Sequence, residues 1–385
     1  MSQPSVASRG LDLVNEWYDR FEAWLLTDKR SIYGASLARI LAGCSVMGIL
    51  ITNFRVRNLM FGQGSVWNKP LQDDAIYWPP RLIVSHMGNT TFLFYYLFVI
   101  LLALLFVLGW HSRVVGVLML IGHMSIIERI PVLGDQGDNI LRVGLFLLLF
   151  MHINEHWSLD ARRRARTEAA PNDGVGSVLK NFYNNQRVLP LWLTNGIHNV
   201  VLIALGWQLI MIYFSAGWFK AQGSLWYHGT AIYYPMQLQE YKPFPFLTDA
   251  MTHFGVMVGL GTYVAMVVQI GFGLALLHPV ARRIAIFCAI MFHLSIAVFM
   301  ALPWFSLSMI AFDAIFVSTA TFVLFDRWIR AKLRPVADLF WDVADPIVDK
   351  LPGRSKDGRG AEDDGQGVKE REPSLVRSGP ADQPG

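Results

Sequence analysis

Cysteine and charge are scarce in this sequence. It has two cysteines among 385 residues, Cys44 and Cys288, and each lies inside an apolar run, so we expect two buried thiols and no disulfide framework. Only 16% of the residues are charged, whereas 53% are hydrophobic, and the mean hydropathy is +0.36. Soluble globular domains carry more charge than this, so the composition indicates an integral membrane protein that crosses the bilayer several times.

The sequence also lacks the signatures of several other protein classes. Residues 1–30 contain no apolar core followed by small residues, so no cleavable signal peptide is expected. The net charge of +4 does not indicate a nucleic-acid partner, because the basic residues lie in loops between apolar runs. Glycine-rich phosphate loops are absent, and the spacing of the cysteines favours no metal site.

Apolar runs of spanning length follow one another from residue 32 onwards. They cover about 32–53, 91–109, 114–133, 138–153, 196–219, 252–277, 283–302 and 303–325. The fourth run is short, and only Pro303 separates the last two, so seven and nine spans are alternatives. We predict an all-α integral membrane protein with about eight transmembrane helices.

Amphipathic segments flank this membrane domain, which we place at 31–330. Within the cytoplasmic segment 1–30, residues 11–25 carry apolar side chains at helical spacing, which is typical of a helix lying in the membrane interface. A second interfacial helix is predicted within 331–351. Residues 352–385 have the composition of a disordered cytoplasmic tail.

Lysine and arginine in the short connections indicate the orientation of the chain. They gather before the first span, after the second, fourth and sixth, and beyond the last, which places all of them on one face. We therefore predict a multi-pass protein of the cytoplasmic membrane with both termini in the cytoplasm. Residues 54–90 are a basic exception, and with Trp67, Trp78, Pro79 and Pro80 they are expected to form an ordered extracytoplasmic cap.

Lys220, at the outer end of the fifth span, is the strongest candidate for a catalytic residue. Tyr213, Gly217 and Lys220 share one helix face, and the glycine clears space beside the ammonium. An ammonium at a hydrocarbon boundary is poorly solvated, which favours the neutral amine that acts as a base. The alternative is an interfacial lysine that extends to the lipid headgroups.

Other polar residues of the predicted spans lie at the same membrane level as Lys220. Asp138, Asn139 and Arg142 begin the fourth span, and Glu128 ends the third. We predict an extracytoplasmic-facing pocket in which Lys220 is the base and these first three residues polarise or orient the substrate. The expected substrate contacts are Tyr213, Trp226 and Glu128. The alternative is an ion-pair network, with Arg142 joined to Asp138 or Glu128, that holds helices in register.

Three further intramembrane residues are not predicted to take part in this pocket. Arg39 and Asp313 lie at other levels of the membrane and are expected to be structural. His293 stands alone in an apolar run and is expected to form a hydrogen bond with a neighbouring helix.

The stretch Tyr213-Phe-Ser-Ala-Gly-Trp-Phe-Lys220, with Trp226 and Gly229 after it, resembles the vitamin K-dependent gamma-carboxylase family. It also resembles the bacterial relatives of that family, the horizontally transferred transmembrane (HTTM) domain proteins. The stretch Trp157-Ser-Leu-Asp160 is similar to a Trp-Ser-x-Asp motif of the family, and the resemblance extends over about residues 30–330. It implies that Lys220 deprotonates a quinol and that a reduced naphthoquinone is the cofactor. Where the carboxylases have a catalytic histidine, this chain reads Gly137-Asp138-Asn139, which is closer to the HTTM pattern.

Two functions follow from the resemblance. The first is a carboxylase-like enzyme that acts on a quinol or a secreted peptide at the outer face of the membrane. The alternative is a non-catalytic membrane partner or maturation factor for an exported peptide or protein. A transporter is supported only by the intramembrane charges, because the sequence has no internal repeat.

Overall fold

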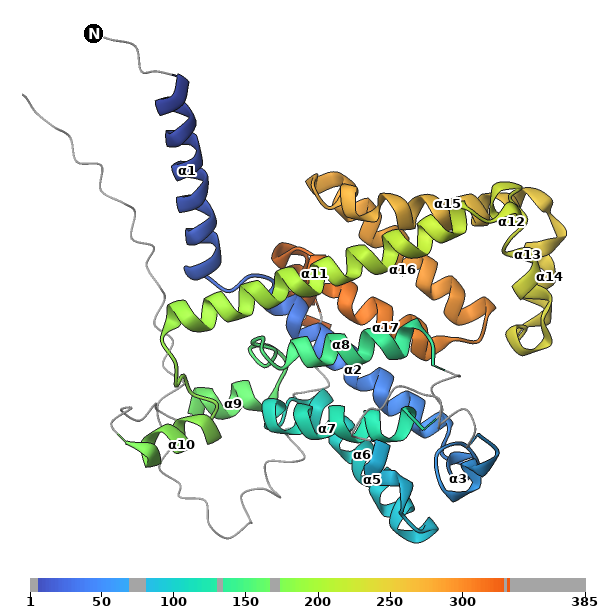
Figure 1. Cartoon of the computed structure of the whole chain (residues 1–385), viewed down its shortest axis with the longest axis horizontal. Helices are drawn as coiled ribbons and strands as arrows, with labels where there is room; N and C mark the ends of the chain where they lie inside the picture. The colour runs from blue at the N-terminus through green and yellow to red at the C-terminus, as the bar shows by residue number, and fades with distance from the viewer. Residues whose placement is uncertain (1–5, 69–80, 130–133, 167–173, 329–330, 333–385) are drawn as a thin grey trace, which may run out of the picture. The chain divides into compact units, whose positions relative to one another are not determined.

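The computed structural model describes residues 6–68, 81–129, 134–166, 174–328 and 331–332, and over these residues the chain is helical without any strand (Figure 1). The longer helices are α1 (Val6–Leu26), α2 (Ile32–Thr52), α6 (Asn89–Leu108), α7 (Ser112–Ile127), α8 (Gln136–Leu148), α11 (Leu191–Ala221), α15 (Gly255–Ala275), α16 (Pro279–Phe299) and α17 (Pro303–Asp313). The shorter elements are α3 (Arg57–Met60), η1 (Gln63–Asn68), α5 (Arg81–Ser85), α9 (Leu159–Arg166), α10 (Val175–Tyr183), α12 (Ser224–Tyr227), α13 (Tyr233–Gln237), η3 (Gln239–Tyr241), α14 (Pro245–His253) and η4 (Ala314–Phe316). All of them belong to one compact unit, Met1–Leu324. In the second unit, Phe325–Gly385, the rings of Phe325 and Trp328 stack at 6.2 Å.

Five of the described helices are long and apolar enough to cross a membrane, namely α2, α6, α11, α15 and α16. A sixth joins them if the bent helix pair that starts with α17 counts as one span. The all-α prediction is confirmed over the described residues, and each predicted run contains a helix. The run 303–325 was wrong as a single helix, because α17 ends at Asp313 and the chain breaks again after η4. There Ser318 Oγ accepts a hydrogen bond from Thr321 N (3.3 Å) and starts a new helical segment.

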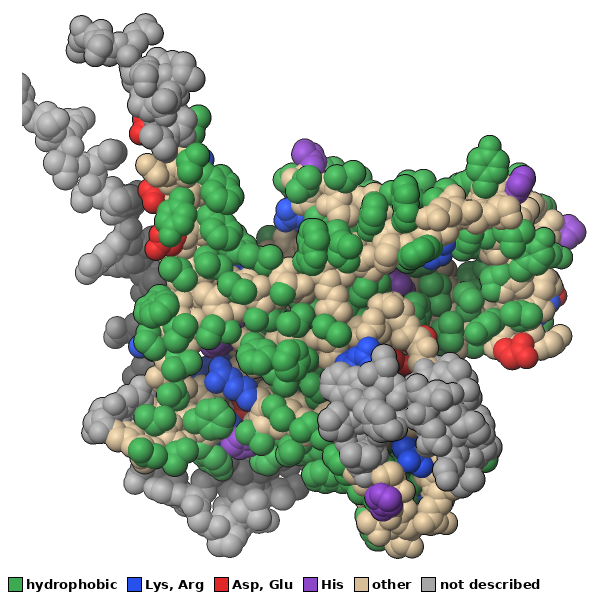
Figure 2. Space-filling model, in the orientation of Figure 1, with side chains coloured by type: hydrophobic (Ala, Val, Ile, Leu, Met, Phe, Trp, Pro, Cys, Tyr) green, Lys and Arg blue, Asp and Glu red, His purple; other side chains and the backbone are tan. Residues whose placement is uncertain are grey.

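An exposed apolar stripe runs along α11. Its members recur every three or four residues and are all exposed: Val200, Ile203, Trp207, Met211, Phe214 and Trp218. Figure 2 shows hydrophobic side chains spread along α11 and its neighbour α15. An apolar surface of this extent is unfavourable in water, so it supports a membrane environment for these helices.

Arg39 on α2 holds three segments of the bundle together. Its side chain is fully buried (0% exposed), and its guanidinium donates to four backbone carbonyl groups. These are Phe106 (2.7 Å) and Val107 (2.6 Å) at the end of α6, and Ile153 (3.0 Å) and Trp157 (2.8 Å) after α8. The last carbonyls of a helix have no partner within it, so Arg39 satisfies groups that are otherwise costly to bury. This confirms the structural role expected for Arg39.

Asp160, in the stretch that resembles the Trp-Ser-x-Asp motif, also has an architectural role. Its carboxylate accepts hydrogen bonds from the backbone N–H groups of His111 and Ser112, both at 2.8 Å, and from Ser112 Oγ at 2.8 Å. Asn154 and Arg163 donate to the same carboxylate. A carboxylate at this place caps the first turn of α7 and stabilises it through the helix dipole.

The segments that flank the predicted membrane domain are described in part. α1 confirms a helix over 11–25, and its apolar side chains Leu13 and Trp17 are both 67% exposed. The loop 54–90 contains α3, η1 and α5, while its residues 69–80 lie outside the described part of the chain. Apart from residues 331 and 332, the predicted helix within 331–351 and the tail 352–385 also lie outside it.

Candidate functional site

A cavity of about 430 Å³ lies between α11, α15, α16 and α17, with α12 and α13 at its side. We call it the Lys220 cavity. Its polar lining residues are Gln136, Tyr213, Lys220, Trp226, Gln269, His293 and Ser295, and its other walls are apolar, including Ala265, Phe292 and Met309. A mostly apolar cavity with a few polar groups is the usual form of a small-molecule site.

Gly217 allows this cavity to form beside Lys220. It lies three residues before the lysine, where α11 meets α15. A Cβ atom at Gly217 would be 2.9 Å from the backbone nitrogen of Ile270 and 3.0 Å from Cβ of Gln269. Because only glycine permits this close approach, the pair of helices brings Lys220 and Gln269 to the same cavity.

The ammonium of Lys220 is half-buried and has weak partners. Its Nζ donates to the carbonyl oxygen of Ala216 at 3.5 Å and lies 5.3 Å from the centre of the Trp226 ring. Among the described residues no carboxylate forms an ion pair with it. The cation–π contact with Trp226 contributes about 0.5–2 kcal/mol and orients the amine without neutralising it. The amine is therefore accessible to a proton-donating ligand.

Tyr213 and His293, which line the Lys220 cavity, form a hydrogen-bonded group with Asp313 behind the lining. Tyr213 Oη donates to Asp313 Oδ2 at 2.6 Å, and it lies 3.0 Å from His293 Nε2. The tyrosine hydroxyl has one proton, which it gives to Asp313, so the Nε2–H of His293 must donate to Tyr213 Oη. Nδ1 of His293 is then an acceptor, and it has no hydrogen-bond partner among the described residues.

A second buried acceptor lines the same cavity. Gln269 is 5% exposed, and its Oε1 has no hydrogen-bond partner in the described part of the chain. A buried acceptor without a partner costs about 1–3 kcal/mol. Gln269 and His293 therefore favour a ligand that carries hydrogen-bond donors, such as hydroxyl groups.

The structure does not bring Asp138, Asn139, Arg142 and Glu128 into the Lys220 cavity. All four line a separate cavity of about 200 Å³, which we call the Glu128 cavity. Arg142 Nη1 lies 3.0 Å from Glu128 Oε1, and Arg142 Nη2 donates to Asn139 Oδ1 at 2.8 Å. This is the ion pair that the alternative interpretation of the sequence expects between Arg142 and Glu128.

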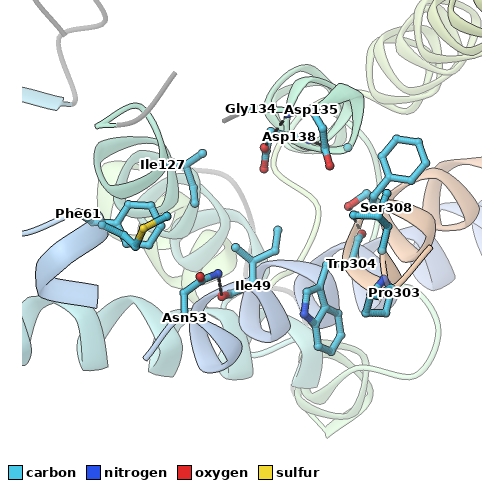
Figure 3. Close-up of a pocket in the computed structure, with 15 residues that line it drawn as sticks. Ile49, Asn53, Phe61, Ile127, Gly134, Asp135, Asp138, Pro303, Trp304 and Ser308 are labelled. Carbon is cyan, nitrogen blue, oxygen red and sulfur yellow. Dashed lines mark hydrogen bonds between the residues drawn. The ribbon is translucent and has the colours of Figure 1, made fainter. Parts of the chain in front are cut away.

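Asp138 has a local role at the start of α8. Its carboxylate accepts from Asp135 N, and Asp138 N donates to Asp135 Oδ1, both at 3.1 Å, which forms a capping box. Asp138 also lines a further cavity of about 260 Å³, together with Trp304 and Ser308 of α17 (Figure 3).

The expectation of one shared pocket is wrong because membrane level does not fix the direction of a side chain. α8 does reach the Lys220 cavity, but through Gln136. Asp138 is two residues further along, so it points about 200° away around the helix axis. A Cβ atom on Gly137 would lie 2.9 Å from Phe305 of α17, and Phe305 also lines the Lys220 cavity. The start of α17 therefore lies between Asp138 and the residues of the Lys220 cavity.

No family model, curated protein or solved structure matches this chain. Support for a function therefore comes from the residues and the geometry of the site alone.

The segment His152–His156 has the His-x-x-Glu-His spacing of one class of zinc enzymes, which the expectation of no metal site overlooked. In the structure this segment is not helical. Glu155 forms an ion pair with Arg164 at 2.6 Å, and the ring of His156 stacks on Tyr33 at 3.5 Å. Within the described ranges no three His, Cys, Asp or Glu side chains are grouped so that they could hold a metal ion.

Sequence reasoning missed Gln269 and the part that Asp313 plays in the site. The expectation that His293 bonds to a neighbouring helix is confirmed by its contact with Tyr213 of α11. Asp313 reaches the site through the same tyrosine. The sequence held one signal for these residues. Tyr213 and Lys220 share a helix face, so any partner of Tyr213 lies near the same side of the helix as Lys220.

Proposed function

We propose that this chain is a multi-pass protein of the HTTM family in the cytoplasmic membrane, with about eight spans and both termini in the cytoplasm. We propose further that it is a gamma-carboxylase-like enzyme that binds a reduced naphthoquinone in the Lys220 cavity. The observation that carries this proposal is a half-buried amine, without an ion-pair partner among the described residues, at an apolar cavity. Tyr213 and Trp226 are its proposed substrate contacts.

In this proposal the quinol lies with its apolar ring against the walls of the cavity. One hydroxyl group donates to one of the acceptors Gln269 Oε1 and His293 Nδ1, and the other donates to the amine of Lys220, which removes its proton. Dioxygen is the co-reactant. It oxidises the quinol to the quinone epoxide, one oxygen atom enters the epoxide, and the other leaves as water with the two quinol hydrogens.

The test is epoxide formation by the purified protein in detergent, with a reduced naphthoquinone and dioxygen. Removing a general base lowers a rate by about 10²–10⁴-fold, so Lys220→Ala and Lys220→Arg should both abolish measurable turnover at normal abundance. Lys242→Ala is the matched control, because Lys242 pairs with Asp249 (2.6 Å) and does not line the cavity. Full activity of Lys220→Arg, or loss of abundance equal to the loss of activity, would contradict the catalytic role.

One observation favours a second function, that of a non-catalytic partner or maturation factor for an exported peptide or protein. Asp138 and Asn139 stand where the carboxylases have their catalytic histidine. Asp138 takes part in the capping box of α8, and Asn139 accepts a hydrogen bond from Arg142. Well-folded protein that binds the quinol but forms no epoxide would favour this second function.

A further inference from the structure

A second cavity, distinct from the Lys220 cavity, is lined by two arginines. We call it the Arg30 groove. It has a volume of about 460 Å³ and lies between α11, the α1–α2 connection, the α15–α16 connection and η4. Arg30 and Arg282 both line it, and its described lining contains no carboxylate. The groove therefore has a charge that only an anion complements.

The long wall of the Arg30 groove is apolar and follows one face of α11. The residues that form it are Leu202, Ile203, Gly206, Trp207 and Ile210. Their spacing of one, three, one and three residues keeps them on one side of the helix over a length of about 12 Å. Ile203 and Trp207 also belong to the exposed apolar stripe of α11, so the groove opens towards the surface that lipid would contact.

Gly206 keeps the middle of the groove open. A Cβ atom there would meet Phe316 at 3.5 Å, which is an ordinary contact, so a small side chain fits and a large one fills the groove. Trp24 and Trp207 both line the groove, and tryptophan is enriched at the level of the lipid headgroups.

Arg30 is held in place by α11. Its backbone N–H donates to Asn199 Oδ1 at 2.9 Å, and its carbonyl oxygen lies 2.7 Å from His198 Nε2. The next residue, Ser31, donates from Oγ to the carbonyl oxygen of Ile315 at 2.6 Å. Because both backbone groups of Arg30 are bonded, the position of its backbone beside the groove does not depend on a ligand.

Arg282 is held by the end of α15. Its Nε and Nη2 donate to the carbonyl oxygen of Leu276 at 3.0 and 2.8 Å, which uses two of its three nitrogens. It lies in the first turn of α16, which contains no acidic residue, and the start of a helix adds partial positive charge. Both arginines thus line a groove whose wall on α11 is apolar.

We propose that the Arg30 groove binds an anionic phospholipid. The phosphate lies between Arg30 and Arg282, and one acyl chain follows the apolar wall from Leu202 to Ile210. The basic residues of these two connections belong to the face predicted to be cytoplasmic, so the lipid comes from the cytoplasmic leaflet. A free phosphate would leave the apolar wall uncovered, and a zwitterionic lipid would gain less from the two arginines.

The test is lipid binding by the purified, delipidated full chain, measured by native mass spectrometry. The probes are phosphatidylglycerol, phosphatidylcholine and inorganic phosphate. Phosphatidylglycerol should bind most tightly, and Arg30→Gln and Arg282→Gln should each weaken it by about fivefold. Arg283→Gln, next in sequence but outside the lining, is the matched control and should bind normally. Gly206→Leu should weaken both lipids, because it fills the groove.

Two results would overturn the proposal. Equal binding of the two lipids, unchanged by either arginine variant, would show that the groove does not select an anion. Displacement of phosphatidylglycerol by millimolar inorganic phosphate would indicate a phosphate site. A second measurement does not need the arginine variants. Brominated phosphatidylglycerol should quench the fluorescence of Trp207 in the unaltered chain, and Trp207→Phe identifies which part of the signal comes from this residue. Absence of quenching would also overturn the proposal. None of these results depends on Lys220.

Discussion

The hydrogen bond between Tyr213 and Asp313 gives a prediction whose size follows from the structure. Tyr213→Phe removes the hydroxyl that donates to Asp313 Oδ2 at 2.6 Å and accepts from His293. Asp313 is 0% exposed and its Oδ1 already has no partner among the residues that the structure describes, so the variant leaves the carboxyl group unsatisfied by them. The lost hydrogen bond and the unsatisfied buried group together cost about 2–4 kcal/mol of unfolding free energy.

The double variant separates the cost of the unsatisfied carboxyl from the loss of the tyrosine. Replacing both partners by apolar groups is close to neutral, so Tyr213→Phe with Asp313→Leu should be no less stable than Tyr213→Phe alone. The assay is the unfolding free energy in detergent micelles, from titration with sodium dodecyl sulfate followed by circular dichroism. If the losses of the two single variants simply added in the double variant, Tyr213 and Asp313 would not be coupled and the reasoning would be refuted.

Two further predictions concern packing. Arg39→Leu should lower the unfolding free energy by about 3–5 kcal/mol, because it removes the guanidinium that donates to four backbone carbonyl groups, with buried contacts at Phe106 and Ile153 and part-buried ones at Val107 and Trp157. A loss below about 1 kcal/mol in the same titration would contradict this role. Gly217→Ala should reduce both stability and quinol binding, because its Cβ meets the backbone of α15, whereas Gly259→Ala, where the nearest atom is 3.8 Å away, should leave both measurements unchanged.

The sequence was a good guide to the helices because apolar length alone requires them in a membrane. The run 32–53 corresponds to α2 (Ile32–Thr52), and 91–109 corresponds to α6 (Asn89–Leu108). The run 138–153 was too long, since α8 ends at Leu148 and the chain then turns so that Ile153 can meet Arg39. That contact is tertiary, and no local pattern specifies it.

The candidate site was predicted in part, because a local pattern gives the helix face of a residue but not the helices that pack against it. Tyr213 and Lys220 share a helix face and do line one cavity. Asp138 was placed at the right end of its helix but on the wrong side, because the level of a residue was known and its direction was not. Gln269 and Asp313 join the site only through the packing of α15 and α17 against α11, which depends on contacts between residues far apart in the sequence.

The most direct test of the proposed quinol site is to map where the quinol binds. A photoreactive analogue of a reduced naphthoquinone is cross-linked to the purified chain, and the attached peptides are identified by mass spectrometry with unlabelled quinol as competitor. The predicted result is attachment at the walls of the Lys220 cavity, such as Met236 or Met309, that the competitor abolishes. Competed attachment at the Glu128 cavity, or labelling that the competitor does not reduce, would contradict it.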